Sequence, residues 1–159
     1  MRSVGIDIAA AGWSSVALAV DGVPVKAVIW KPPTKSSNPL RLELQYRWHE
    51  RYLNIFKPDI IAVEELAVFM SKTVIRALAR HEGVALLAAK QSGAVVLSPT
   101  TSQSRGIVLG NGRLSKDDAW LTFKRRYPDF KLLAKRSGGS DQMDAMTHAL
   151  AAPTVLERR

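Results

Sequence analysis

The chain has 159 residues, 47% of them hydrophobic, and a formal net charge of +9. This length fits one domain over residues 1–159 with a substantial core and leaves little room for a second. The absence of cysteine excludes disulfides, thiolate nucleophiles and cysteine-based zinc sites. No apolar stretch approaches the roughly 20 residues that cross a bilayer, so we expect a cytoplasmic protein with no membrane partner.

The positive charge is concentrated in one region of the chain. Residues 90–136 contain ten Lys or Arg residues against three Asp residues. A surplus of this size favours a polyanionic partner, either nucleic acid or an acidic membrane surface, and the charge alone does not choose between them.

Three strands are predicted at the N-terminus. Residues 3–9 form an apolar run that is interrupted only by Asp7. Residues 14–20 and 23–30 are two further runs of β type, and the Asp-Gly pair at 21–22 that joins them is a strong hairpin signal. The chain is therefore expected to begin with an antiparallel meander.

Helices and strands alternate in the middle of the chain. Apolar residues recur at helical spacing over residues 40–57, and residues 72–90 are rich in Ala and Leu, so both segments are predicted helices. Residues 59–66 contain four successive apolar residues, the pattern of a central strand covered on both faces. Residues 94–97 predict a fifth strand.

The C-terminal part is predicted as two loops and two helices. Residues 100–115 contain Gly and Ser and are expected to form a loop, after which Ser115 caps a helix. Residues 131–139 form a second predicted loop. The last helix is capped by Ser140 and is expected to end before Pro153. The order β-β-β-α-β-α-β-α-α predicts a mixed α/β fold.

Acidic residues interrupt or flank the apolar segments at Asp7, Glu64, Asp141 and Asp144. A carboxylate beside buried apolar surface is tolerated mainly when a cation or a donor compensates it. The last two are three apart and share one helix face. The alternatives are an exposed sheet end for Asp7 and a solvated first helical turn for the C-terminal pair. Neighbours on a strand face opposite ways, so Glu64 is preferred and Glu65 remains the weaker alternative.

Oxygen ligands of this kind select Mg²⁺, or Mn²⁺, over zinc. Four carboxylates are enough for two ions. Two metals roughly 4 Å apart activate the attacking water and stabilise the leaving 3′ oxygen of a phosphodiester. In a strongly basic chain, such a site indicates cleavage of nucleic acid.

The ordered set of motifs resembles the RuvC-type Holliday-junction resolvases of the ribonuclease-H-like superfamily, over nearly the whole chain. The matching segments are VGIDIA (4–9), IAVEE (61–65), VFMSK (68–72), GIVLGNGRLSKDDA (106–119) and SDQMDAMTHAL (140–150). The resemblance implies a five-stranded sheet in the order 3-2-1-4-5, a homodimer, and metal-dependent paired nicks across four-way DNA junctions. A chain this compact also resembles a phage-encoded resolvase, acting in a bacterial or phage-infected cell.

The resemblance also implies roles for individual residues. The four acids would be the catalytic metal ligands. Lys116 and Arg105 match basic positions near the scissile phosphate, and Arg113 is added as a DNA contact from the same segment. Phe69 matches an aromatic near the opened bases. The alternatives are a solvated cation for Lys116, a loop charge for Arg105 and a core side chain for Phe69. His148 either reaches the site or simply packs.

Other functions compete with this interpretation. Residues 5–22 also resemble the phosphate-binding hairpin of actin-like and sugar-kinase ATPases, but no second such segment follows. A related nuclease that acts on forks, flaps or RNA–DNA hybrids, and a non-catalytic junction-binding module, remain open. The helix at residues 71–90 is the candidate dimer interface because of its apolar content.

Overall fold

The computed structural model describes residues 1–9, 12–66 and 71–159. The elements in chain order are β1 (Arg2–Ile8), β2 (Ser14–Val20), β3 (Val23–Trp30), α1 (Asn38–Phe56), β4 (Ile60–Val63), α2 (Lys72–Gln91), β5 (Val95–Leu97), α3 (Thr101–Leu109), α4 (Lys116–Arg126) and α5 (Gly139–Glu157). A short 3-10 turn, Lys135–Ser137, precedes α5. Within the described ranges, no helix has the length and hydropathy that a bilayer crossing requires.

The five strands form one sheet in the order β3-β2-β1-β4-β5, which confirms the predicted order. β1, β2 and β3 pair antiparallel, whereas β4 lies parallel to both β1 and β5. The predicted hairpin between β2 and β3 is also confirmed. Its turn places Asp21 and Gly22 at φ angles of 50° and 77°, the left-handed geometry that a tight hairpin turn requires.

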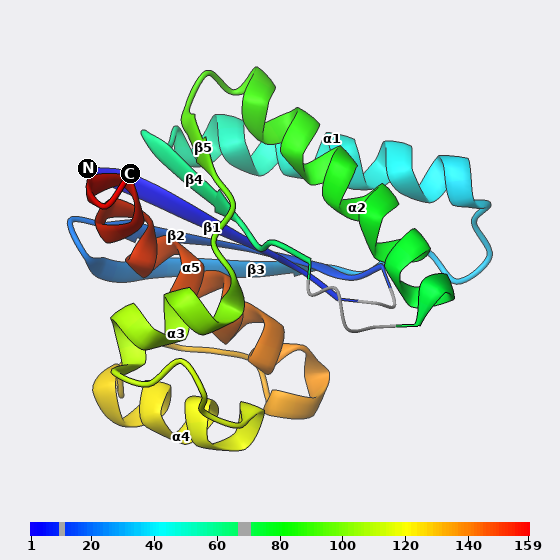
Figure 1. Cartoon of the computed structure of the whole chain (residues 1–159). Coiled ribbons are helices and arrows are strands. Elements are labelled where there is room, and N and C mark those ends of the chain that lie inside the picture. Colours follow the sequence, from blue (N-terminus) through cyan, green and yellow to red (C-terminus); the bar gives the residue numbers. More distant parts are fainter. Residues whose placement is uncertain (10–11, 67–70) are drawn as a thin grey trace.

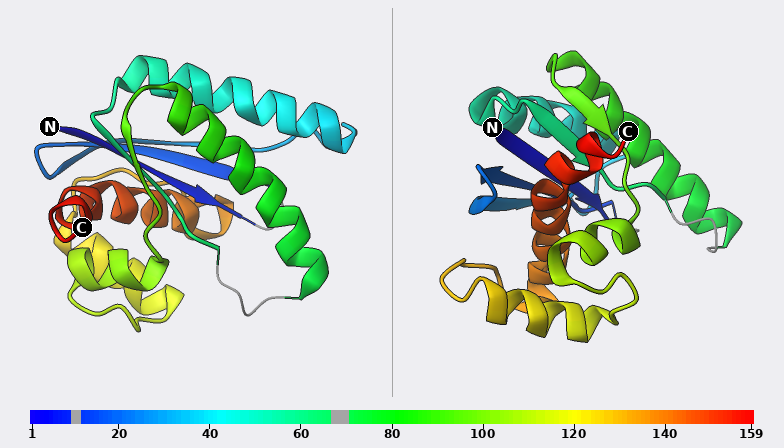
Figure 2. Two further views of the ribbon diagram at one scale, coloured as in Figure 1. Left: turned by 45° about the horizontal axis from the view of Figure 1, so that its top comes forward. Right: turned by 60° about the vertical axis from the view of Figure 1, so that its left-hand side comes forward.

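The sheet lies between two helical layers (Figures 1 and 2). α1 and α2 cover one face, and α5, with α3 and α4 beyond it, lies on the other. Val4, Ile6 and Ile8 of β1 belong to the core cluster under α1 and α2. Because side chains alternate along a strand, Gly5 and Asp7 face the α5 layer instead.

α5 crosses β1 in close contact at Gly5. A Cβ atom on Gly5 would lie 1.9 Å from the carbonyl oxygen of Ala145 and 2.5 Å from the backbone nitrogen of Ala149. Only glycine fits this distance between helix and strand without a shift of the backbone. The crossing therefore sets the position of α5 relative to the end of β1, where Asp7 lies.

The predicted loop at residues 100–115 is wrong in its first half, which forms α3. Thr100 and Gln103 make a capping box: the Thr100 side chain accepts from the Gln103 backbone N–H, and the Gln103 side chain accepts from the Thr100 backbone N–H. These bonds satisfy two donors that an uncapped helix start leaves unpaired. The helix ends at Gly110, whose φ of 84° suits a left-handed cap.

The prediction that the last helix ends before Pro153 is also wrong, because α5 continues through this proline to Glu157. An interior proline costs about 3 kcal/mol in a helix. Ala151 and Ala152 are fully buried, and Val155 packs against the same core clusters. Burial of this last segment against the sheet offsets the missing hydrogen bond.

Candidate active site

Asp7 and Glu64 lie side by side at the carboxyl ends of two neighbouring parallel strands. Ile6 of β1 pairs with Val63 of β4, and the Glu64 backbone N–H donates to the Ile6 carbonyl at 3.0 Å. This register brings the next residue of each strand to the same edge of the sheet. One oxygen from each carboxylate and a ring nitrogen of His148 all lie within 4.8 Å of one another.

The structure separates the two adjacent glutamates of the IAVEE motif. Glu64 is partly buried and accepts a hydrogen bond from the Thr101 hydroxyl at the start of α3. Glu65 is exposed, and its backbone N–H donates to the Pro99 carbonyl at 3.0 Å. Strand alternation thus directs Glu64, and not Glu65, toward Asp7.

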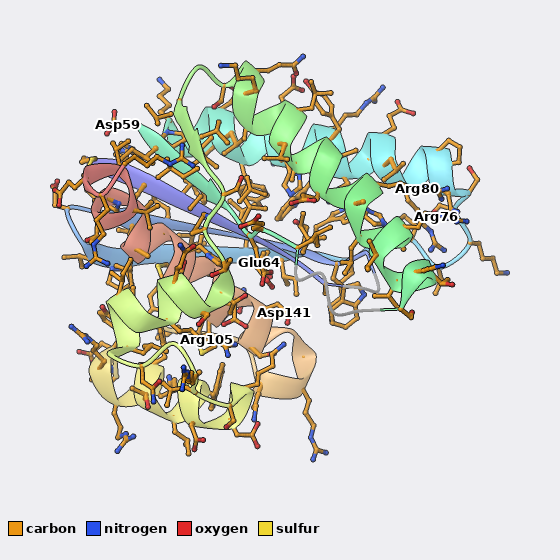
Figure 3. The ribbon with its side chains drawn as sticks, in the orientation of Figure 1. Asp59, Glu64, Arg76, Arg80, Arg105 and Asp141 are labelled. Atoms are coloured by element: carbon orange, nitrogen blue, oxygen red, sulfur yellow. The ribbon has the colours of Figure 1, made fainter. Side chains whose placement is uncertain are left out.

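Asp141 and Asp144 project from the first turns of α5, and each is paired with a cation. The Arg105 guanidinium holds Asp144 through both carboxylate oxygens, with Nη2 at 2.9 and 3.1 Å. The Lys116 Nζ donates to Asp141 at 3.1 Å. Figure 3 shows Glu64, Arg105 and Asp141 in one region of the molecule, whereas Asp59 lies at the opposite end of the sheet.

The four acids influence one another electrostatically. Burial raises the pKa of Asp7 well above its ordinary value, and the negative charges of Glu64, Asp144 and Asp141 raise it further. Burial also raises the pKa of Asp144 to about 6, although Arg105 opposes the shift. Burial opposes the ionisation of Glu64, but hydrogen bonds from Asp7 and Thr101 lower its pKa. Without another cation, the cluster is best satisfied when it retains a proton.

One other predicted residue does not join this cluster among the residues that the structure describes. Arg113 lies in the connection between α3 and α4, where its side chain is exposed and its backbone N–H donates to Asn111. Phe69 lies outside the described residues, so its predicted role stays a prediction.

Thr101 and Ser104 are site residues that the sequence analysis missed. Both come from α3, the segment expected to be a loop. Thr101 donates to Glu64, and the Ser104 hydroxyl lies 2.8 Å from Nδ1 of His148. The signal that would have found them is the Thr-x-x-Gln spacing from residue 100 to residue 103, because a capping box marks a helix start.

Metal-free Asp7→Asn protein is expected to be more stable than the wild type at pH 8 and to lose this advantage as the pH falls toward about 4. The folded-state pKa of Asp7 is raised, so its stabilising contribution is present below its unfolded pKa of about 4 and is lost as the pH rises through the raised value. Asparagine keeps a donor toward Glu64 at every pH. Melting temperatures in EDTA between about pH 4 and pH 8 measure the effect, at about 2–4 °C per kcal/mol.

A stability difference that does not change with pH would contradict this result. Added Mg²⁺ serves as the control, because a cation bound at the acids should raise the melting temperature of the wild type at pH 8 more than that of the variant.

Comparison with known proteins identifies the family. The model of the family described as "Crossover junction endodeoxyribonuclease RuvC" matches residues 5–151. A protein of that name from Desulfitobacterium hafniense (strain DSM 10664 / DCB-2) is 36% identical over 93 residues, which cover 58% of this chain and 56% of the relative. The match thus spans little more than half the length of that relative.

Solved structures show the same fold. The chain resembles a Thermus thermophilus RuvC structure with a TM-score of 0.77 and 21% identity, covering 98% of this chain and 97% of that one. It also resembles T. thermophilus RuvC in complex with Holliday junction substrate, with a TM-score of 0.80, 18% identity, and coverage of 99% and 96%. The ribonuclease-H-like sheet predicted from the sequence is therefore confirmed. With the family match over residues 5–151, the chain belongs to the RuvC family of crossover junction endodeoxyribonucleases.

Proposed function

We propose that this chain is a metal-dependent endonuclease that resolves four-way DNA junctions by paired, symmetric nicks. The observation that supports this best is the meeting of acids from β1, the end of β4 and α5 beside Arg105 and Lys116. Membership of the RuvC family and the likeness to a RuvC bound to Holliday junction substrate support the choice of DNA. The net charge of +9 favours the same polyanionic partner.

The acidic residues fit divalent cations. Asp7 and Glu64 form a partly to fully buried pair of like charge, an arrangement that a cation stabilises. We assign Asp7, Glu64, Asp141 and Asp144 as the ligands of two Mg²⁺ ions, with Mn²⁺ as the alternative, because carboxylate oxygens suit these metals. When bound, such ions supply Lewis acidity at the scissile phosphate and lower the pKa of the attacking water.

Lys116 and Arg105 would neutralise the phosphate during cleavage. In the metal-free chain they pair with Asp141 and Asp144. With cations held by these acids, both ion pairs would weaken, and the ammonium of Lys116 and the planar guanidinium of Arg105 would bind phosphate oxygens instead. Lys116 is half exposed and can reach a bound strand, and exposed Arg113, in the connection before α4, adds a contact with the DNA backbone.

Paired nicks require two active sites on one junction, so we propose that the chain acts as a homodimer. Three small or apolar residues, Ala79, Gly83 and Leu87, follow one exposed line along α2, and Leu87 is 52% exposed. The other face of α2 packs against α1 through residues such as Leu78 and Ala85. The exposed line therefore supports α2 as the contact with a second copy.

One gel tests the proposal. Labelled immobile four-way junction and matched linear duplex are incubated with the protein, with and without Mg²⁺. We expect two nicks at symmetric positions in the junction, none in the duplex, and none in EDTA. Binding should weaken steeply with salt, since each phosphate contact releases a counterion. Preferential cutting of forks, flaps or RNA–DNA hybrids would mean that one of these, and not the junction, is the substrate. Binding of the junction without cleavage would support a non-catalytic junction-binding module.

A further inference from the structure

His148 lies next to the acidic pair and is fully buried. It projects from α5 one turn after Asp144, and its exposed fraction is 0%. One of its ring nitrogens is within 4.8 Å of carboxylate oxygens of both Asp7 and Glu64. Among the described residues, Nε2 has no hydrogen-bond partner, although burial without a partner costs about 1–3 kcal/mol.

Ser104 is the partner of the other ring nitrogen of His148. Its hydroxyl lies 2.8 Å from Nδ1 of His148, and both side chains are fully buried. When Nδ1–H donates to this hydroxyl, the proton is on Nδ1 and the lone pair is on Nε2. Metal-binding histidines are commonly oriented in this way, by a second group that accepts from the nitrogen not bound to the metal.

The distances suit one shared cation. Metal bonds to carboxylate oxygen and imidazole nitrogen are about 2.1 Å long, so two ligands of one ion lie up to about 4.2 Å apart. The three ligand atoms here are within 4.8 Å of one another without an ion. Side-chain rotations that shorten these separations to about 3–4 Å would bring all three into contact with one ion.

We propose that His148 is a nitrogen ligand of a metal held with Asp7 and Glu64, and that Ser104 positions it. The inference rests on the proposed metal site and extends its ligand set from oxygen alone to oxygen and nitrogen. Imidazole favours Mn²⁺ and later transition metals over Mg²⁺, so this ligand raises the affinity of the site for Mn²⁺ relative to Mg²⁺.

The first test uses the unmodified chain, so no variant has to fold. Mn²⁺ is titrated into the protein without DNA, binding is followed by loss of the free-ion electron paramagnetic resonance signal, and electron spin echo modulation detects directly bound nitrogen. We expect ¹⁴N modulation that changes to the ¹⁵N pattern when the histidines are ¹⁵N-labelled. Bound Mn²⁺ without nitrogen coupling overturns the role of His148 and leaves the carboxylate site intact. Absence of Mn²⁺ binding overturns the metal site as well.

Variants assign the coupled nitrogen. His148→Leu should lose the modulation and bind Mn²⁺ at least about 10-fold more weakly, with a smaller loss for Mg²⁺. Ser104→Ala should weaken Mn²⁺ binding about 10-fold, at the lower end of the range for groups that orient a ligand. His81→Gln is the matched control, since His81 of α2 hydrogen-bonds Gln45 of α1 and does not belong to the group of Asp7, Glu64 and His148. Persistent nitrogen coupling in His148→Leu would refute the assignment, as would its loss in His81→Gln.

Discussion

Asp7→Asn protein is expected to bind a four-way junction normally but to cut it at least about 10²- to 10³-fold more slowly in Mg²⁺, the range for loss of one preorganised charge-stabilising group. Asp7 is the acid on which the charges of Glu64, Asp141 and Asp144 all act, so it lies centrally among them. Removing its charge weakens cation binding at the site. Affinity for phosphate should not fall, because one negative charge fewer reduces repulsion.

Single-turnover cleavage of a labelled junction and a gel-shift titration in Ca²⁺ measure the two effects separately. Glu65→Gln is the matched control, because this acid adjoins Glu64 in the sequence but is exposed. It should cut at close to the wild-type rate, whereas Glu64→Gln should behave like Asp7→Asn. Undiminished cleavage by Asp7→Asn would refute the catalytic assignment.

Gly5→Ala is expected to destabilise the fold by about 3 kcal/mol or more, at the upper end of the range for overpacking. The added Cβ would meet backbone atoms of α5, at 1.9 Å from the Ala145 oxygen and 2.5 Å from the Ala149 nitrogen. Backbone cannot rotate away as a side chain can, so α5 has to move off β1. A domain of this size should melt about 6–12 °C lower.

Gly106→Ala is the matched control for this substitution. Gly106 lies inside α3, and a Cβ there would be 3.6 Å from the backbone nitrogen of Gly112, the nearest atom outside its own helix, which is an ordinary contact. Alanine should therefore stabilise the protein by about 0.5–1 kcal/mol. Thermal denaturation of both variants compares a position where an added Cβ clashes with backbone atoms, Gly5, with one where it makes only an ordinary contact, Gly106. An unchanged melting temperature for Gly5→Ala would mean that α5 does not rest on β1 as closely as described.

Local patterns in the sequence accounted for most of the secondary structure. The Asp-Gly turn at 21–22 and the four apolar residues before Glu64 depend only on neighbouring residues, and both features were confirmed. The failures at α3 and Pro153 have a different cause. A capping box that was overlooked starts α3, and the continuation past Pro153 depends on burial against a sheet formed by distant residues.

By itself, the sequence determined most of the strands and helices and singled out the candidate acids, because strand alternation, turn chemistry and apolar runs depend on adjacent residues; the strand order was implied by the family resemblance and is confirmed by the structure. Only the tertiary structure decided how these acids are paired. The contacts of Arg105 with Asp144 and of Ser104 with His148 join residues 39 and 44 positions apart. These contacts exist because α5 approaches β1 at Gly5 and α3 packs on α5. The positions of helices depend on the packing of whole surfaces, so the spacing of residues along the sequence does not predict them.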